Sequence, residues 1–293
     1  MARDLQFGIF LSPAAAAYDE AVRVAKLADD LELDLIGIQD HPYQRRFLDT
    51  FSLMASLLAQ THHVRVFPDV ANLPLRGAAM IAKAAASLDV MSGGRFELGL
   101  GAGGFGDAVA AMGGPRRTPA EAVTAFVDAV AVIRALWSGE RGLRVAGEQY
   151  HLAGVHSGPV PAHDIQIWSG AGGPRMLALT GELADGWIPS LFSVPPEKLD
   201  ARHVRIDEAA EKVGRDPSAI RRLYNLNGRI TDGASEGHLH GPTDQWVDQL
   251  GALANDHRID SFIWGPDAGD VEGQVRRYAE QVAPAVRANH TGM

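Results

Sequence analysis

The stretch VRVFPDVANLPLRGAAMIAKAAASLDVMSGGRFELGLG, residues 64–101, decides the fold. Its first part, 64–70, is a short apolar and β-branched run that predicts a buried strand. An Ala-rich helix is predicted for 78–91, and Ser92-Gly93-Gly94 then turns the chain into a second apolar strand at 95–101. Apolar strands separated by helices are typical of a parallel sheet that is covered by helices.

The same alternation extends in both directions along the chain. Strands are predicted at 7–10 and 35–39 with a helix at 18–31, and a further helix begins near Pro119 with Thr118 as its N-cap. The remaining predicted strands are 164–169, 186–190, 223–230 and 261–265, and the remaining helices are 174–180, 197–213, 243–255 and 271–288. Eight such strands alternating with helices predict a closed (β/α)8 TIM barrel of the α/β class, with 1–293 as a single domain. An open doubly wound sheet usually has fewer units and a GxGxxG motif after its first strand, whereas this first strand ends in FLSP.

Composition excludes several classes of protein. The 293 residues are 46% hydrophobic and carry a formal net charge of −9, which argues against binding to nucleic acids or anionic membranes. The absence of cysteine excludes disulfides, thiolate nucleophiles and cysteine zinc sites. The chain starts without a secretory signal pattern and has no apolar run of about 18 residues, so we expect a cytoplasmic globular protein.

A barrel of this type carries its active site on the loops that follow the strands. These loops are expected at 11–17, 39–50, 69–77, 101–118, 169–174, 189–196, 230–242 and 265–270. The segment 139–163 precedes a strand and belongs to the opposite end. Its His151, His156 and His163 are therefore expected to be structural or solvent-facing.

The sequence SGAGGPRM, residues 169–176, combines a strand end, glycines and a helix start. Free backbone N–H groups at such a helix start, together with the helix dipole, favour a bound phosphate, and Arg175 adds a positive charge. Ser169, Gly170, Ala171, Gly172 and Gly173 are therefore candidate ligand-binding residues. The alternative is a tight turn without a ligand.

Two further loops carry candidate chemistry. Gln39-Asp40-His41-Pro42-Tyr43 places a histidine at the mouth of the second strand, where its ordinary pKa suits proton transfer at neutral pH. PDVANLPLR, residues 68–76, follows the third strand, and a kink there would press against a planar ligand. Asp69 in this loop is either part of such a site or an ordinary loop carboxylate.

Other barrel chemistries lack residues in the required places. The four lysines, Lys26, Lys83, Lys198 and Lys212, all fall on predicted helices, which argues against a Schiff-base aldolase. His238 and His240 lie in a loop, and His62-His63 precedes the third strand, so neither pair predicts a metal site. Asp40 and Asp69 are the carboxylates that a glycosidase would need, and no other feature supports that activity.

The segment SLDVMSGGRFELGLGAG, residues 87–103, closely resembles the bacterial luciferase-like flavin-dependent oxidoreductases. The resemblance continues through IRALWSG (133–139), GEQYHL (147–152), IWSGAGGPRMLALTGELADGWIPS (167–190) and GPTDQWVDQL (241–250), and so covers nearly the whole chain. It implies a (β/α)8 barrel and a cofactor with a tricyclic ring and a ribityl phosphate, either FMN or the deazaflavin F420.

The resemblance also implies roles for individual residues. Gly170 to Gly173 would hold the phosphate, and Ala102, Gly103, Asp40 and Asn72 would line the cofactor. The pair Asp69-Val70 matches a non-proline cis peptide that supports the ring in this family. His41 matches a histidine that transfers protons in F420 enzymes similar to sugar-phosphate and alcohol dehydrogenases. Two partners of that histidine do not match, because a Trp is replaced by Arg45 and a Glu by Gly104, and alcohol oxidation is therefore in doubt; Gly77-Ala78 also replaces the His-Pro usual after Arg76.

F420 is favoured over FMN because the loop 230–242 is short and leaves room for a bulky cofactor tail. With F420, a hydride would pass to or from a small substrate, and His41 would supply or remove the proton. With FMN, the protein would be a two-component monooxygenase that depends on a separate flavin reductase. A flavin-binding barrel without turnover and a flavin-free lyase are further alternatives. The substrate pocket is expected to contain Tyr43, Phe105, Trp187, Phe192 and His240, and family members are often homodimers.

Overall fold

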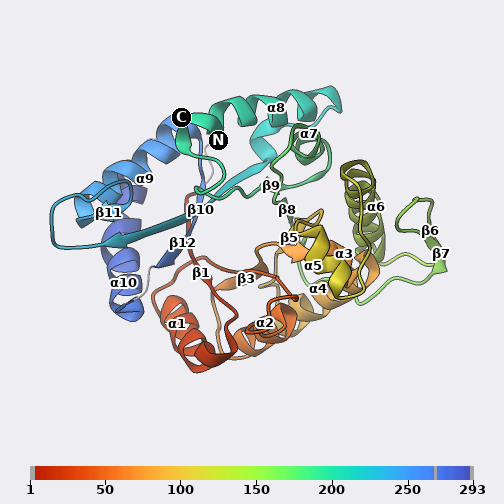
Figure 1. The fold of residues 1–293 in the computed structure, drawn as a ribbon, viewed down its shortest axis with the longest axis horizontal. Helices are drawn as coiled ribbons and strands as arrows, with labels where there is room; N and C mark the ends of the chain where they lie inside the picture. The colour runs from red at the N-terminus through yellow and green to blue at the C-terminus, as the bar shows by residue number, and fades with distance from the viewer. Residues whose placement is uncertain (1–3, 267–268, 291–293) are drawn as a thin grey trace.

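The computed structural model describes residues 4–266 and 269–290 of the chain. Parallel strands form a barrel, and helices lie around it (Figure 1). The strands pair in the order β3-β2-β1-β12-β10-β9-β8-β5-β4. Their bounds are β1 Gln6–Leu11, β2 Leu35–Ile38, β3 Arg65–Pro68, β4 Ala71–Asn72, β5 Leu98–Gly101, β8 Ile167–Ser169, β9 Gly186–Trp187, β10 Arg221–Ile230 and β12 Ser261–Pro266.

The third strand is divided, and this division closes the barrel. β3 pairs with β2, whereas β4 pairs with β5. Val66 of β3 also forms a parallel bridge with Phe96, just before β5, which joins the two ends of the sheet. When β3 and β4 are counted as one strand, the described residues contain eight parallel barrel strands, and the predicted (β/α)8 barrel is confirmed.

Most helices follow the predicted order. Their bounds are α1 Tyr18–Asp30, α4 Ala78–Ser92, α6 Pro119–Trp137, α7 Pro174–Leu183, α8 Leu199–Lys212, α9 Thr243–His257, α10 Val271–Arg277 and α11 Ala283–Asn289. A π-helical turn, Tyr278–Val282, joins α10 to α11. The predicted cap of α6 is confirmed: the Thr118 hydroxyl accepts from the Glu121 N–H, and the Glu121 carboxylate accepts from the Thr118 N–H.

Some elements were not expected from the sequence. Helix α2, Thr50–Leu58, is buried at six of its nine positions and therefore lacks a clear apolar stripe. Short helices α3 (Leu73–Arg76) and α5 (Gly106–Ala111) lie in predicted loops. The segment 139–163 contains a hairpin of β6, Leu143–Val145, and β7, Leu152–Val155, and β11, His240–Gly241, pairs with the end of β10.

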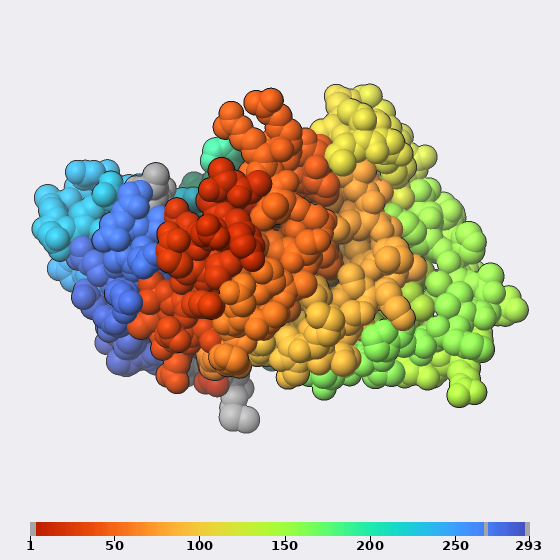
Figure 2. Space-filling view, turned by 90° about the horizontal axis from the view of Figure 1, so that it is seen from below, coloured from red at the N-terminus to blue at the C-terminus, as the bar shows by residue number. Residues whose placement is uncertain are grey.

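The barrel interior is filled by large apolar side chains, and the polar loops lie beyond it. The interior cluster is Leu35, Phe67, Trp168, Ile188, Leu223 and Ile263, with Phe10 and Val70 packed against it. Figure 2 shows that the orange-red loop after β2 and the yellow segment after β5 project from the same rim of the molecule. None of the helices in the described residues has the length and apolar character needed to cross a membrane.

Candidate active site

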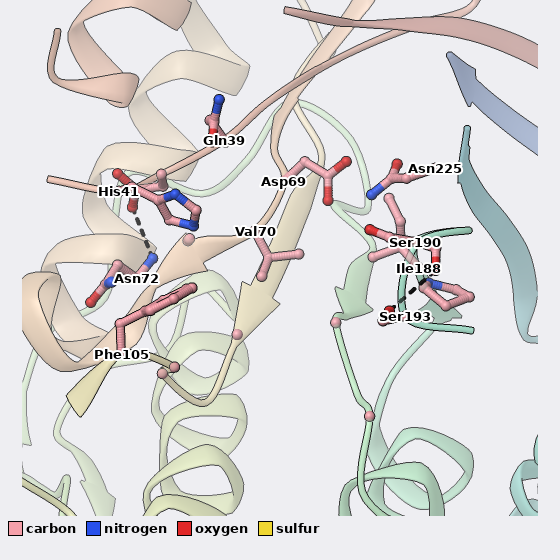
Figure 3. Close-up of a pocket in the computed structure, with 18 of the residues that line it drawn as sticks. Gln39, His41, Asp69, Val70, Asn72, Phe105, Ile188, Ser190, Ser193 and Asn225 are labelled. Carbon is pink, nitrogen blue, oxygen red and sulfur yellow. Dashed lines mark hydrogen bonds between the residues drawn. The ribbon is translucent and has the colours of Figure 1, made fainter. Parts of the chain in front are cut away.

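A cavity of about 390 Å³ lies where the barrel strands end, as expected for this fold (Figure 3). β1 and β10 contribute residues from within the strand, and β2, β3, β5, β8 and β9 contribute residues at or after their ends. The lining residues that the sequence singled out are Asp40, His41, Tyr43, Asp69, Val70, Asn72, Gly103, Phe105, Gly170, Ala171 and Gly172. The fold thus brings together side chains that lie up to 132 positions apart in the chain, from Asp40 to Gly172.

The Val70 side chain projects between two neighbouring strands at the bottom of this cavity. The Asp69–Val70 peptide bond is cis, as the family resemblance implied. A Cβ atom on Gly101 would stand 2.7 Å from Val70 Cγ2, and one on Gly170 would stand 3.1 Å from the same atom. Glycine at these two positions therefore makes room for Val70. Gly170 has a packing role that the sequence did not indicate.

His41 belongs to an aromatic wall of the cavity. Its ring is half-buried and stacks on Tyr43, with ring centroids 5.5 Å apart and planes at 17°. Phe105, from the loop after β5, meets the His41 ring edge-on at 5.6 Å. Burial lowers the pKa of His41 below its ordinary value, and the negative charge of Asp40 opposes this shift. His41 is therefore mainly neutral at pH 7 and able to accept a proton.

Asp40 lines the cavity, but its carboxylate is already occupied. Arg76 donates two hydrogen bonds to it, from Nε at 2.6 Å and Nη2 at 2.7 Å, and the backbone N–H of Asn72 donates a third at 2.8 Å. The Asn72 side chain accepts a hydrogen bond from the Leu75 N–H and caps α3. These contacts show that Asp40 positions the loops around it. Contact of Asp40 and Asn72 with a cofactor stays a prediction.

Asp69 lies at the inner end of the cavity, on the opposite side of Val70 from His41 (Figure 3). Burial raises the pKa of its carboxyl group to about 7, and a hydrogen bond from Asn225 acts in the lowering direction. Its Oδ2 atom has no hydrogen-bond partner within residues 4–266 and 269–290. The carboxylate of Asp40 is neutralised by a cation. In contrast, no cation is among the groups that shift the pKa of Asp69.

The glycine-rich turn after β8 leads into α7 as predicted. Pro174 occupies the first turn of α7. The N-cap residue is Gly173, which has no side chain to accept a hydrogen bond from the first N–H groups of the helix. A Cβ on Gly172 or Gly173 would meet no described atom within 4 Å, so the space before this helix start is open. Behind the turn, the Trp187 indole donates to the Ala171 carbonyl at 2.9 Å and Arg202 donates to the Gly172 carbonyl at 2.8 Å. The helix start is thus fixed from behind and open in front.

Several predicted residues lie outside the cavity lining: Ala102, Ser169, Gly173, Arg175, Trp187, Phe192 and His240. Trp187 is fully buried and supports Ala171 from behind, whereas the Phe192 side chain is 97% exposed. His240 lies on β11 next to Arg229, in a loop that does not reach the cavity. Neither loop 230–242 nor any of these three side chains lines the cavity, and their contact with a substrate stays a prediction. Gly173 and Arg175 remain beside the open helix start and are exposed.

Other lining residues were missed by the sequence analysis. They are Phe10, Gln39, Ala71, Gly101, Gly104, Ile188, Pro189, Ser190, Ser193 and Asn225. Asn225 had a recognisable signal, because it is a polar residue in the apolar strand LYNLNGRI. Ser190 bridges to Asn225, which extends the short strand β9 toward the cavity. Ser190 and Ser193 carried no signal because serine is common in any loop.

Comparisons with known proteins agree with this architecture. The family model described as luciferase-like monooxygenase matches residues 5–236. A 5,10-methylenetetrahydromethanopterin reductase of Methanolobus tindarius is 32% identical over 216 residues, which cover 74% of this chain but 63% of that protein, less than two thirds of its length. An F420-dependent glucose-6-phosphate dehydrogenase of Gordonia bronchialis is 29% identical over 77% of this chain and 69% of its own. A solved F420-dependent secondary alcohol dehydrogenase, in complex with an F420-acetone adduct, superposes with a TM-score of 0.85 at 19% identity over 97% of this chain and 99% of that one.

Proposed function

Because the chain belongs to the luciferase-like monooxygenase family, we propose that it is an oxidoreductase that uses coenzyme F420 for hydride transfer to or from a small organic substrate. The observation that carries this proposal is one cavity in which an open helix start and the titratable His41 face the same space. The name of the relative from Gordonia bronchialis, an F420-dependent dehydrogenase, supports F420 as the cofactor. The proposal includes a cytoplasmic location, residues 1–293 as one domain and a homodimer, which stay predictions.

The residues of the cavity fit a planar cofactor with a phosphate-bearing tail. The phosphate would bind the backbone N–H groups at Gly172 and Gly173, where the positive end of the α7 dipole stabilises an anion. The ring would rest on Val70, which projects into the space left by Gly101 and Gly170. When bound, such a deazaflavin supplies or accepts a hydride. The role of each of these residues is part of the proposal.

His41 would move the proton that accompanies the hydride. Reduction of a C=N or C=C bond needs one hydride and one proton, and oxidation releases both. A neutral imidazole nitrogen can accept that proton in the oxidising direction, and the imidazolium can donate it in the reducing direction. The stacked rings of Tyr43 and Phe105 hold His41 in place and keep water from one side of it.

Fluorescence titration of the purified protein with F420 and with FMN tests the proposal. Tight binding of F420 with weak binding of FMN is the expected result. The reverse would favour the alternative of a two-component monooxygenase with a separate flavin reductase. Binding of FMN or F420 without reduction or reoxidation by any substrate would favour a non-catalytic flavin-binding barrel. Binding of neither would contradict the cofactor assignment.

A further inference from the structure

The carboxyl group of Asp69 occupies a space that glycine leaves open in the second strand. A Cβ atom on Gly37 of β2 would stand 3.1 Å from Asp69 Oδ2, and 3.2 Å from a methyl group of Ile263. It would stand 2.9 Å from the Phe67 ring. Asp69 Oδ2 therefore lies above the apolar barrel interior, although the residue also lines the cavity. A carboxylate in such surroundings loses its hydration without gaining a cation.

The polar neighbour of Asp69 is the Asn225 side chain of β10, which faces it across the inner end of the cavity (Figure 3). The interaction of the Asn225 side chain with the Asp69 carboxyl group acts to lower the pKa of Asp69. The Asn225 Oδ1 atom is buried and has no partner in the described residues. Each side chain of this pair thus keeps one oxygen without a hydrogen bond, which indicates a polar site that a ligand atom can complete.

The other ionisable groups of the cavity belong to the segment after β2. Asp40 is neutralised by Arg76, while His41 and Tyr43 stack on each other in the opposite wall. β12 presents the apolar Ile263 to Asp69, β1 contributes Phe10 to the lining, and β10 presents the uncharged Asn225. No charged group in the described chain is among the causes of the shift in the pKa of Asp69 to about 7.

We propose that Asp69 is a neutral carboxylic acid that donates a hydrogen bond, from the inner end of the cavity, to a carbonyl oxygen or ring nitrogen of the bound planar molecule. Asn225 is its positioning residue, because its side chain faces the Asp69 carboxyl group, whose Oδ2 atom has no hydrogen-bond partner in the described residues. The proposal rests on the proposed function for the identity of the ligand. The protonation state of Asp69 in the ligand-free protein does not depend on the proposed function.

The variant Asp69→Asn provides the binding test. Asparagine has nearly the same shape and can donate a hydrogen bond, but it does not ionise between pH 6 and pH 8.5. Dissociation constants for F420 and FMN are measured by fluorescence for both proteins at these two pH values. The ligand's own ionisation is common to both proteins and cancels in the ratio. We expect the wild-type affinity to fall about tenfold more than that of the variant as the pH rises.

The variant His41→Asn is the matched control, because it removes the other titratable group of the cavity. It is expected to keep the wild-type pH dependence of binding. Equal pH dependence in the wild type and Asp69→Asn would overturn the proposal. Loss of the pH dependence in His41→Asn would show that His41, and not Asp69, causes it. That result would also overturn the proposal.

A measurement without any ligand separates this proposal from the proposed function. ¹³C NMR of the aspartate carboxyl groups in the ligand-free wild type is expected to show one group that titrates near pH 7. Asn225→Ala is expected to raise that midpoint, because the hydrogen bond that favours the ionised form is lost. Failure of both cofactors to bind would contradict the proposed function alone. Absence of a carboxyl group titrating above pH 6 would overturn the role of Asp69 whatever the cofactor is.

Discussion

Arg76 and Asp40 form a two-pronged ion pair, with Nε 2.6 Å from Oδ2 and Nη2 2.7 Å from Oδ1. The Asp40 side chain is 1% exposed and the Arg76 side chain 18%. The same Nη2 atom donates to Asp49, the N-cap of α2, and the guanidinium lies 4.4 Å from the centre of the Phe51 ring. This pair therefore joins the end of β2, which carries His41, to the loop after β3, which carries Asp69 and Val70.

Replacement of Asp40 should destabilise the whole rim. In Asp40→Asn, Arg76 keeps Asp49 as its counterion but loses the buried one. Loss of one partner of a fully buried pair typically costs about 3–5 kcal/mol, which is an upper bound here because Arg76 is partly exposed. Asp107→Asn is the matched control, since the Asp107–Arg116 pair is 82% and 73% exposed and such pairs contribute about 0–1 kcal/mol. Urea denaturation measures both variants. Similar losses in the two would show that the Asp40 pair has no special role.

The proposed role of His41 predicts a change in turnover rather than in binding. His41→Ala should lower kcat by about 10²–10⁴-fold, the usual contribution of a positioned proton-transfer group, and should leave the cofactor dissociation constant nearly unchanged. Tyr43→Phe keeps the stacked ring and is expected to retain most activity. Steady-state kinetics and fluorescence titration separate the two effects. A parallel loss of kcat and binding in His41→Ala would assign His41 to packing.

The alternation of apolar strands and helices was sufficient to predict the barrel, because each strand is buried on both faces. It did not reveal that the third strand breaks at Asp69–Val70, since the run 64–70 remains apolar up to Pro68. Helix α2 was missed because six of its nine positions are buried, and the remaining positions are too few to give a clear amphipathic period.

Site residues were predictable where they directly follow a strand. His41, Asp69 and Gly172 meet in one cavity because parallel strands end at the same rim. Trp187 and Phe192 do not line the cavity, one because it is fully buried and the other because it is exposed. The sequence does not distinguish an aromatic residue near a strand end that is buried, like Trp187, from one that is exposed, like Phe192. The packing of the folded chain decides whether such a residue is buried. The ion pair of Asp40 was not predictable because its partner, Arg76, is 36 residues away in sequence.

Two glycines of the turn after β8 should respond differently to alanine. Gly172→Ala adds a methyl group in open space, so the free energy of unfolding should change by less than about 1 kcal/mol. That methyl group would stand where the phosphate is proposed to bind, and affinity for FMN should fall while affinity for riboflavin, which has no phosphate, stays the same. In Gly170→Ala the methyl group contacts Val70 at 3.1 Å, and binding of both ligands should weaken.

Riboflavin and FMN titrations of both variants check this contrast. If Gly172→Ala weakened both ligands equally, the helix start would not be the phosphate site. If Gly170→Ala bound both ligands like the wild type, Val70 would not support the ring.

His203 predicts how stability depends on pH. Its ring is fully buried on α8, lies edge-on to Trp187 at 5.3 Å, and both of its nitrogens lack a partner in the described chain. Burial lowers the pKa of His203 to about 2, and the charges of Arg222, Arg258 and His257 act in the same direction. The unfolded chain therefore binds a proton below pH 6.5 that the folded chain does not bind, so this group lowers the free energy of unfolding as the pH falls.

His203→Leu should remove this acid sensitivity. Between pH 7 and pH 5, the wild type is expected to lose about 2 kcal/mol more stability than the variant, since each pH unit below 6.5 contributes about 1.4 kcal/mol. His163 acts in the opposite sense, because hydrogen bonding to Glu97 and the charges of Glu97 and Asp89 raise its pKa, but it is present in both proteins and cancels in the difference. His62→Gln, an exposed substitution, is the control and should follow the wild-type curve. Urea unfolding of the three proteins at pH 5, 6 and 7 measures the slopes, and parallel curves for the wild type and His203→Leu would mean that His203 binds its proton equally well in the folded chain.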